Sequence, residues 1–309
     1  MAGERVMLSK MLTHHVELHR GLGFKFRTQH GLLRSFVSFA EAHGDTFVHV
    51  DRVLEWARQA PSSPQRRNRL VTVRRFALAL HAEDAQHQVP PADALGREMF
   101  RRRVPYIYTP DEISRLMAAT SVLPTGSDRP LTYATLFGLL AVTGMRISEA
   151  LALRLDDITT DGLVIRRTKF QKSRLLPLHD TARSALDHYV LVRRRMATSA
   201  ETLFVSAKGH VLSDNTVRYV FLRLARSVDL RGKPDQRAPR IHDLRHTYAV
   251  RSLEQCGSEP DKVARHLLAL STYLGHAHVT DTYWYLQATQ ILMTRIAEVS
   301  ESAHQGGVA

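Results

Sequence analysis

The first part of the chain repeats apolar residues at the spacing of an α-helix. The repeats fall in three stretches, at residues 32–40, 50–56 and 70–80. Residues three and four apart share one face of a helix, so each stretch carries an apolar stripe that needs a partner. Helices with short connections bury such stripes against one another. The pattern therefore predicts a compact bundle of three or more helices over residues 1–95.

A break in this pattern predicts the domain boundary. The periodicity fades from about Ala82 to Tyr108, a stretch that holds three prolines and a cluster of arginines and is typical of a linker. A new unit begins with the segment Thr-Pro-Asp-Glu, from Thr109 to Glu112. Threonine caps a helix, proline fits its first turn, and two acids favour its positive end. We expect a basic linker over residues 96–108 and a second domain over residues 109–309.

The second unit has the pattern of a mostly helical domain with a small sheet. Residues 131–142 are apolar almost all round, which is typical of a buried helix. Two further apolar runs, at residues 163–165 and 175–178, flank a polar turn and predict a β-hairpin. Helical spacing resumes at Thr181 and continues to the tail. The predicted fold class is mainly α with a small β-sheet insertion.

The charge balance narrows the function of such a protein. The 309 residues include 43 Lys plus Arg against 30 Asp plus Glu, a formal net charge of +13. This sign favours a polyanionic partner, most often nucleic acid. A single cysteine excludes an internal disulfide framework and a cysteine-rich zinc module. No apolar run approaches the roughly 18 residues that span a bilayer, so we expect a soluble cytoplasmic protein with no membrane partner.

Two groups of arginines are candidate DNA contacts. One group lies in the third apolar stretch and the other in the linker. A run of cations is ordinarily a solvated helix face. No acid interrupts the first group, and in a basic protein this favours contacts to a phosphate backbone. The two groups are Arg66, Arg67, Arg69, Arg74 and Arg75, and Arg101, Arg102 and Arg103.

Arg146 lies where a turn leads into a predicted helix, in the segment from Thr143 to Leu151. We expect it in the first turn of that helix. A cation there opposes the helix dipole, so local stability does not explain its presence. Glu149 follows three residues later on the same face and could orient the guanidinium. Taken alone, such a pair is ordinarily a surface salt bridge.

The segment from Ile241 to His246 carries a stronger signal. His242 and Arg245 are three apart and share a helical face, where a guanidinium binds phosphate oxygens while an imidazole handles a proton. A metal site on His242 and His246 is the competing interpretation. It is less favoured because no glutamate follows the first histidine and no cysteine lies nearby. A purely structural role for His242 is a further alternative.

Read together with Leu274-Gly275-His276 and Tyr285, these residues make the chain resemble the tyrosine recombinases, also called the phage integrase family. The resemblance covers the whole chain and points to recombinases of mobile elements. It implies a SAM-like core-binding domain at residues 1–95, and a catalytic domain with a C-terminal tail helix at residues 109–309. The catalytic residues that it implies are Arg146, Lys169, His242, Arg245, His276 and the nucleophile Tyr285.

Several neighbouring residues compete for these roles. Tyr283 lies two residues before Tyr285, so a helix points the two side chains to nearly opposite sides. The spacing of the family from His276 selects Tyr285. Lys172 competes with Lys169 in the hairpin, and the pattern of the family favours Lys169. The remaining histidines of this region are interpreted as structural or surface residues: His246, His266 and His278.

The resemblance also implies the reaction and its partners. DNA strands are cut and rejoined through a 3′-phosphotyrosyl intermediate, without metal, ATP or another cofactor. The two arginines and His276 would stabilise the phosphate. Lys169 would protonate the leaving 5′ oxygen, and His242 would manage the proton of Tyr285. The implied partners are double-stranded DNA and a homo- or hetero-tetramer assembled on two DNA sites, with companion recombinases as a further option.

Two rival functions share part of this pattern. A type IB topoisomerase uses nearly the same chemistry, but the basic N-terminal bundle and the size of the chain fit a recombinase better. A catalytically silent DNA-binding protein is disfavoured because all six catalytic positions hold competent residues. An apolar stripe in residues 287–309 could pack either on its own domain or on a neighbouring protomer. Transposition, phage integration and chromosome-dimer resolution all stay open as biological roles.

Overall fold

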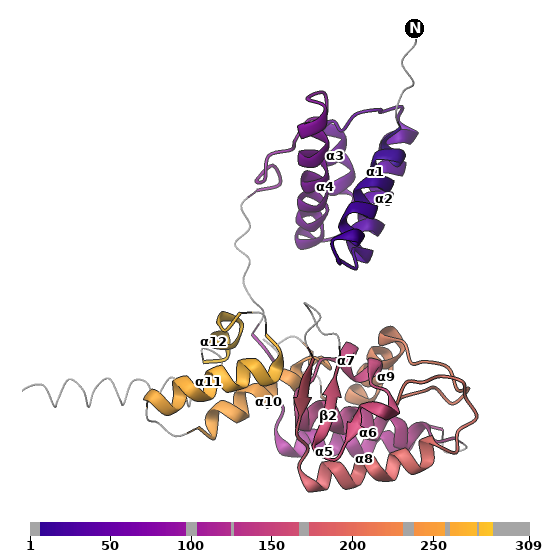
Figure 1. Cartoon of the computed structure of the whole chain (residues 1–309), viewed down its shortest axis with the longest axis vertical. Coiled ribbons are helices and arrows are strands. Elements are labelled where there is room, and N and C mark those ends of the chain that lie inside the picture. Colours follow the sequence, from indigo (N-terminus) through magenta and orange to yellow (C-terminus); the bar gives the residue numbers. More distant parts are fainter. Residues whose placement is uncertain are drawn as a thin grey trace, which may run out of the picture. The chain divides into compact units, whose positions relative to one another are not determined.

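The structure is a computed structural model that divides into two compact units, Met1–Arg102 and Arg103–Ala309. Figure 1 traces both units, and each is described here by itself. The structure describes residues 7–96, 104–124, 127–166, 173–230, 238–256, 260–276 and 278–286.

In residues 7–96 the first unit is a bundle of four helices (Figure 1). The three predicted stretches become the last three of these helices, and a further helix precedes them. The helices are α1 (Leu8–Gly21), α2 (Arg27–Ala42), α3 (Val50–Arg58) and α4 (Ser63–Glu83).

The apolar stripes of these helices form one core, as the pattern predicted. Phe36 of α2 and Trp56 of α3 meet edge to face, with ring centroids 5.5 Å apart. Phe76 of α4 is completely buried beside them, and α1 adds the buried Leu8 and Leu12. Aromatic pairs in this geometry stabilise a core beyond their buried area. The bundle therefore has a hydrophobic core of its own.

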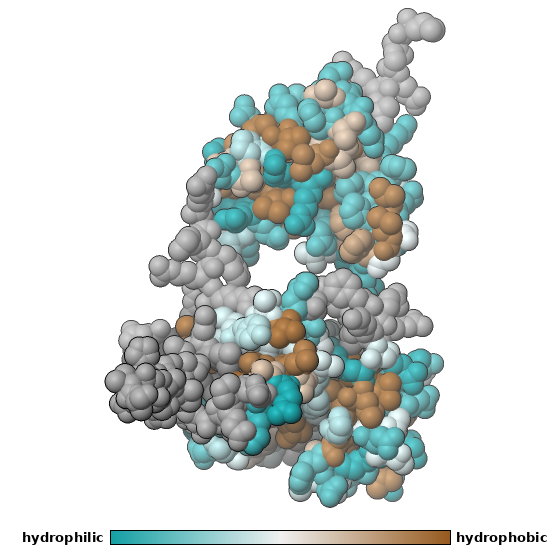
Figure 2. All heavy atoms as spheres, turned by 60° about the vertical axis from the view of Figure 1, so that its left-hand side comes forward, coloured by the Kyte–Doolittle hydropathy of each residue, from teal (hydrophilic) through white to brown (hydrophobic). Residues whose placement is uncertain are grey.

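Some apolar side chains of the first unit remain at its surface. Leu18, Leu22 and Phe24, at the end of α1 and just after it, are 55%, 67% and 57% exposed. Figure 2 shows brown apolar patches of this kind among mainly hydrophilic residues. Single exposed apolar residues are normal for a folded domain.

The second unit is mainly helical, which confirms the predicted fold class. Its first helix begins as expected: the Thr109 hydroxyl accepts a hydrogen bond from the Glu112 N–H (3.1 Å), and Glu112 accepts one from the Thr109 N–H (2.8 Å). The helical elements described are α5 (Pro110–Ala118), η1 (Ala119–Val122), α6 (Arg129–Thr143), α7 (Ile147–Ala152), η2 (Leu155–Asp157), α8 (Asp180–Arg193), α9 (Asp214–Ser227), α10 (Asp243–Glu254), α11 (Pro260–Leu274) and α12 (Thr280–Leu286).

A small antiparallel sheet interrupts these helices, in the order β1-β2-β3. Strands β2 (Gly162–Ile165) and β3 (Arg174–Leu176) pair, with Leu163 opposite Leu176 and Ile165 opposite Arg174. This confirms the predicted hairpin. Strand β1 (Ile158–Thr159) pairs with β2 and forms a short edge strand of the sheet.

Helix α6 crosses the centre of the second unit and packs against α8 and α10. Phe137 of α6 is completely buried and meets Phe221 of α9 at a right angle, with ring centroids 5.5 Å apart. Burial all round was expected for this helix, yet Val142 is 51% exposed. One edge of α6 therefore faces solvent, because neighbouring elements cover only part of its circumference. Among the residues that the structure describes, no helix is long and apolar enough to cross a membrane.

Candidate active site

Arg146 caps the N-terminus of α7 and joins it to the end of α11. It is the N-cap residue, with φ −73° and ψ 144°, so it precedes the first turn in which the sequence placed it. Its guanidinium Nη1 donates to Glu149 Oε1 (2.9 Å), which confirms the predicted pair. Its Nη2 donates to the carbonyl of Gly275 (3.0 Å), 129 residues further along the chain. Two distant segments thus fix the position of one guanidinium.

The turn before Arg146 requires a glycine. Gly144 ends α6 with φ +60°, a left-handed conformation that side chains disfavour. A Cβ atom at this position would lie 2.6 Å from Cδ1 of Tyr248. The carbonyl of Gly144 accepts a hydrogen bond from Nη1 of Arg245 (2.8 Å). The turn therefore supports a second arginine as well as delivering Arg146.

Arg245 lies in α10 and is buried, with 3% of its surface exposed. Its Nη2 donates to the carbonyl of Leu274 (2.8 Å), next to the carbonyl that holds Arg146. Burial, and then the nearby charge of Arg146, lower the pKa of Arg245 to about 10. The guanidinium is still a cation at neutral pH. The structure thus brings two positive charges to the C-terminal end of α11.

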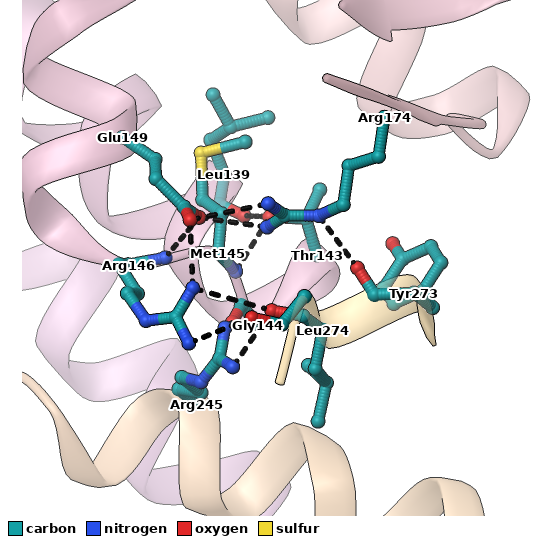
Figure 3. Close-up of polar contacts among 11 residues, drawn as sticks. Leu139, Thr143, Gly144, Met145, Arg146, Glu149, Arg174, Arg245, Tyr273 and Leu274 are labelled. Atoms are coloured by element: carbon teal, nitrogen blue, oxygen red, sulfur yellow. Dashed lines mark hydrogen bonds and ion pairs between the residues drawn. The ribbon is translucent and has the colours of Figure 1, made fainter. Parts of the chain in front are cut away.

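Glu149 connects Arg146 to a third arginine that the sequence interpretation missed (Figure 3). Arg174, the first residue of β3, donates from Nη1 and Nη2 to the two carboxylate oxygens of Glu149 (3.1 and 2.7 Å). Its Nε donates to the carbonyl of Tyr273 (2.7 Å). Burial alone would raise the pKa of Glu149, but the hydrogen bonds from Arg174 and Arg146 outweigh it and lower that pKa. Glu149 is therefore a carboxylate at neutral pH.

A sequence signal for Arg174 exists in the strand pattern. Side chains two apart in a strand share a face, so Arg174 points to the same side as the buried Leu176. A charged residue on the inward face of a strand needs a partner there. Gly275 also makes room for it, because a Cβ atom at that position would lie 2.8 Å from Arg174 Nη1.

Tyr285 of α12 is buried in this site, with 3% of its surface exposed. Tyr283 is 51% exposed, which confirms that the two tyrosines point to different sides. The ring of Tyr285 lies nearly parallel to that of His276, with centroids 6.2 Å apart. Burial raises the pKa of Tyr285, against the opposing positive charges of Arg245 and Arg146. The phenol is neutral in the free protein.

His242 and His276 flank the arginines. His242 occupies the N-cap position of α10, and His276 follows α11 with Nδ1 at 2.7 Å from the hydroxyl of the buried Thr282. Burial, and then the charge of Arg245, lower the pKa of each histidine to about 4. Both are neutral at pH 7. Within the described part of the chain, no group of three or more His, Cys, Asp or Glu residues is placed to hold a metal ion.

His246 has a different place from the one expected. It was interpreted as a structural or surface residue, but its Nδ1 lies 3.1 Å from the hydroxyl of Tyr285. Because α10 carries His246 directly after Arg245, the helix turns it towards α12, a relation that sequence spacing does not reveal. His266 does have a structural contact, to the Ser252 hydroxyl (3.0 Å), and His278 is exposed.

Several predicted site residues fall outside the described residues, namely Lys169, Arg101, Arg102, Arg103 and the tail from residue 287. The arginines of α4 are described, and three of them bond to main-chain carbonyls in the bundle. Arg69 donates to the carbonyl of Trp56 (2.9 Å) and stacks over its ring, and Arg74 donates to that of Pro90 (2.7 Å). Arg66 donates to the carbonyl of Ala60 (2.8 Å), and it is exposed like Arg67 and Arg75.

Comparison with known proteins decides the family of this chain. The model of the phage integrase family matches residues 107–290, which include every described residue of the cluster around Arg146, Arg245 and Tyr285. The chain belongs to the phage integrase family. It is a tyrosine recombinase, an enzyme of site-specific DNA recombination.

Relatives of this recombinase agree with the family match over nearly the whole chain. A putative integrase/recombinase, y4rB, of Sinorhizobium fredii (strain NBRC 101917 / NGR234) is 41% identical over 293 residues, 90% of this chain and 92% of the relative. Tyrosine recombinase XerC of Thermodesulfovibrio yellowstonii is 25% identical, with 94% of each chain covered. A lambda integrase tetramer bound to a Holliday junction has the same fold, with a TM-score of 0.64 and 19% identity, covering 91% of this chain and 77% of that chain.

Proposed function

We propose that this recombinase cuts and rejoins duplex DNA through a phosphodiester between Tyr285 and a DNA 3′ end. The observation that carries the proposal is the burial of the Tyr285 hydroxyl beside His246, in the field of Arg245 and Arg146. A tyrosine kept for packing alone has no need of two cations. A nucleophile that attacks a phosphate anion does.

The arginines would stabilise the charge that builds up on phosphorus-bound oxygens during attack. Each guanidinium carries five N–H donors, so the carbonyl bonds that hold Arg146 and Arg245 leave donors for phosphate oxygens. Such preorganised donors contribute about 3 kcal/mol each to the stability of a transition state. In this proposal the two guanidiniums supply the charge stabilisation that a metal ion would otherwise give. No ATP is needed, because the energy of the broken bond is kept in the tyrosyl phosphodiester.

His276 supports the same phosphate in its neutral form. The hydroxyl of Thr282 donates to Nδ1 of His276 in this assignment, which leaves the proton on Nε2. A neutral imidazole with that proton donates a hydrogen bond to a phosphate oxygen. Lys169, outside the described residues, is proposed to protonate the departing 5′ oxygen.

We further propose that the first unit is the core-binding domain and that four protomers assemble on two DNA sites. The exposed Arg66, Arg67 and Arg75 of α4 are proposed phosphate contacts, together with Arg101 to Arg103 of the linker. The assembly is supported by the shared fold of the lambda integrase tetramer on a Holliday junction. A hetero-tetramer with companion recombinases is the alternative form of this assembly. Residues 287–309 would pack on their own domain or on a neighbour.

A covalent-trapping experiment tests the choice of nucleophile. The protein is incubated with a pool of nicked DNA duplexes of randomised core sequence, and covalent adducts are separated on a denaturing gel and sequenced. Adducts are expected with the wild type and with Tyr283→Phe, and not with Tyr285→Phe. Adducts that persist in Tyr285→Phe and vanish in Tyr283→Phe would overturn the assignment. Relaxation of any supercoiled plasmid, regardless of its sequence, would favour a topoisomerase instead.

A further inference from the structure

The hydrogen bond between His246 and Tyr285 gives the nucleophile a partner outside the residues already assigned. Nδ1 of His246 lies 3.1 Å from the phenolic oxygen. Among the described residues, His242 is not in hydrogen-bond contact with Tyr285; its ring instead packs edge to face on His246, with centroids 4.8 Å apart. The histidine expected to manage the proton of Tyr285 therefore supports another histidine that is in position to do so.

We propose that His246 is the general base of the cleavage step and accepts the phenolic proton of Tyr285. This inference rests on the proposed function of Tyr285 as the nucleophile. As the bond from the phenolic oxygen to phosphorus forms, the proton passes from that oxygen to Nδ1. The bond from phosphorus to the 5′ oxygen breaks, and the leaving oxygen takes a proton from a separate acid. On rejoining, a 5′ hydroxyl attacks phosphorus and returns its proton to that acid, the bond from phosphorus to the phenolic oxygen breaks, and the imidazolium returns its proton to Tyr285.

The environment of His246 fixes its ring in the orientation that this transfer requires. Trp284 of α12 packs against it from one element, with ring centroids 5.4 Å apart at an interplanar angle of 67°. His242 packs against it from its own helix. A general base must lie within hydrogen-bond reach of the proton that it removes, and its rotamer must hold it there. Both conditions are met without substrate.

The charges around His246 connect its basicity to the presence of DNA. Burial lowers the pKa of His246 to about 3, followed by the electrostatic effects of His242, of the cations Arg240 and Arg245, and of His276. In the free protein the ring is therefore neutral at pH 7, and the tautomer protonated at Nε2 presents Nδ1 to the phenol. A bound phosphate brings negative charge beside the same cations and raises the pKa of the imidazole. His246 thus becomes a competent base when a scissile phosphate occupies the site.

Replacement of His246 by asparagine tests this role without removing the hydrogen bond. The asparagine Oδ1 stands close to the position of Nδ1 and accepts a hydrogen bond, but it does not take up a proton. General-base catalysis contributes about 10²- to 10⁴-fold, so single-turnover adduct formation should slow by about 10²-fold at saturating enzyme. His266→Asn, in α11 and away from the site, is the matched control and should keep the wild-type rate.

A fluorinated tyrosine at position 285 shows whether His246 acts as a general base or only positions the phenol. Fluorination lowers the pKa of the phenol, so the nucleophile depends less on a base. We expect fluorotyrosine to restore adduct formation in His246→Asn by about tenfold or more, because a Brønsted dependence links rate to the acidity of the phenol. DNA binding and thermal unfolding of each variant show that it is folded.

The outcomes distinguish this inference from the proposed function. If Tyr285→Phe still forms adducts, the proposed function fails. If Tyr285→Phe is inactive but His246→Asn reacts within threefold of wild type, only the base assignment fails. Slow cleavage by His246→Asn without rescue by fluorotyrosine also overturns it, because His246 would then only position the phenol. Slow cleavage with rescue supports it.

Discussion

Glu149 is the residue whose loss should disturb both the stability and the chemistry of this recombinase. Its carboxylate accepts hydrogen bonds from Arg146 N–H and Nη1 (both 2.9 Å) and from two nitrogens of Arg174 (3.1 and 2.7 Å). The side chains of Glu149 and Arg174 are only 9% and 12% exposed. Glu149→Gln keeps the shape of the side chain and removes the charge. It also turns an NH₂ group towards a guanidinium.

The expected cost follows from burial. Breaking a buried ion pair costs about 3–5 kcal/mol, because the remaining charge is left without compensation. The side chain of Arg146 is 31% exposed and keeps part of its hydration. We therefore expect Glu149→Gln to lower the free energy of unfolding by the smallest value in this range, about 3 kcal/mol. For a domain of this size that corresponds to a fall in Tm of about 6–12 °C. A guanidinium of Arg146 displaced by about 1 Å should also slow cleavage by about 10²-fold.

The pH dependence gives an independent check with a definite sign. The pKa of Glu149 is lower in the folded protein than its ordinary value of 4.5. Its contribution to stability is thus fully present above that value and is lost as the pH falls through the folded-state pKa. The difference in Tm between wild type and Glu149→Gln should be full at neutral pH and should narrow below pH of about 4.

Calorimetry of the wild type, Glu149→Gln and Glu201→Gln provides the measurement. Glu201 forms an ion pair with Arg154, but its side chain is 72% exposed, so the control should lose less than about 1 kcal/mol. Covalent adduct formation is measured on the same samples. A Glu149→Gln protein with wild-type Tm and wild-type cleavage would refute the role of this carboxylate. A Tm difference that grows as the pH falls would refute the assigned charge state.

Three further predictions follow from single contacts. Arg174→Lys keeps the charge but loses the bidentate hydrogen bond to Glu149. It should therefore lower the free energy of unfolding, measured in urea, by about 2 kcal/mol, and an unchanged free energy would contradict this prediction. Gly144→Ala should lower the free energy of unfolding by at least about 1–2 kcal/mol in the same assay, because the position has φ +60° and Tyr248 leaves no room for a Cβ atom. An unchanged midpoint of urea unfolding would show that the turn relaxes freely. Thr109→Ala should cost about 1 kcal/mol by calorimetry, whereas Thr109→Asn, which keeps an acceptor, should cost much less; equal losses would exclude the cap.

Local pattern was enough to predict many of the helices and strands. The hairpin of β2 and β3, the capped start of α5 and three helices of the first unit were predicted because periodicity and caps depend on residues a few positions apart. Helix α1 received no separate prediction. Its inward positions mix leucine and valine with the buried His15, which weakens the apolar stripe.

Pairwise contacts within the site were predicted only where the partners are close in sequence. Glu149 was assigned to Arg146 because three residues on a helix bring them to one face. Arg174 and His246 were missed, since their partners lie 25 and 39 residues away. Such distances are set by how β3, α10, α11 and α12 pack.

The sequence by itself determined the family, the order of helices and strands, and the residue types available for phosphate chemistry. Those properties depend on the spacing of residues a few positions apart, because that spacing determines which side chains share one face of a helix or strand. The tertiary structure alone decided that the carbonyls at the end of α11 hold both Arg146 and Arg245. It also decided that His246, and not His242, lies within hydrogen-bond distance of the Tyr285 hydroxyl. These relations depend on long-range packing, where a rotation of one helix changes which side chain reaches the Tyr285 hydroxyl.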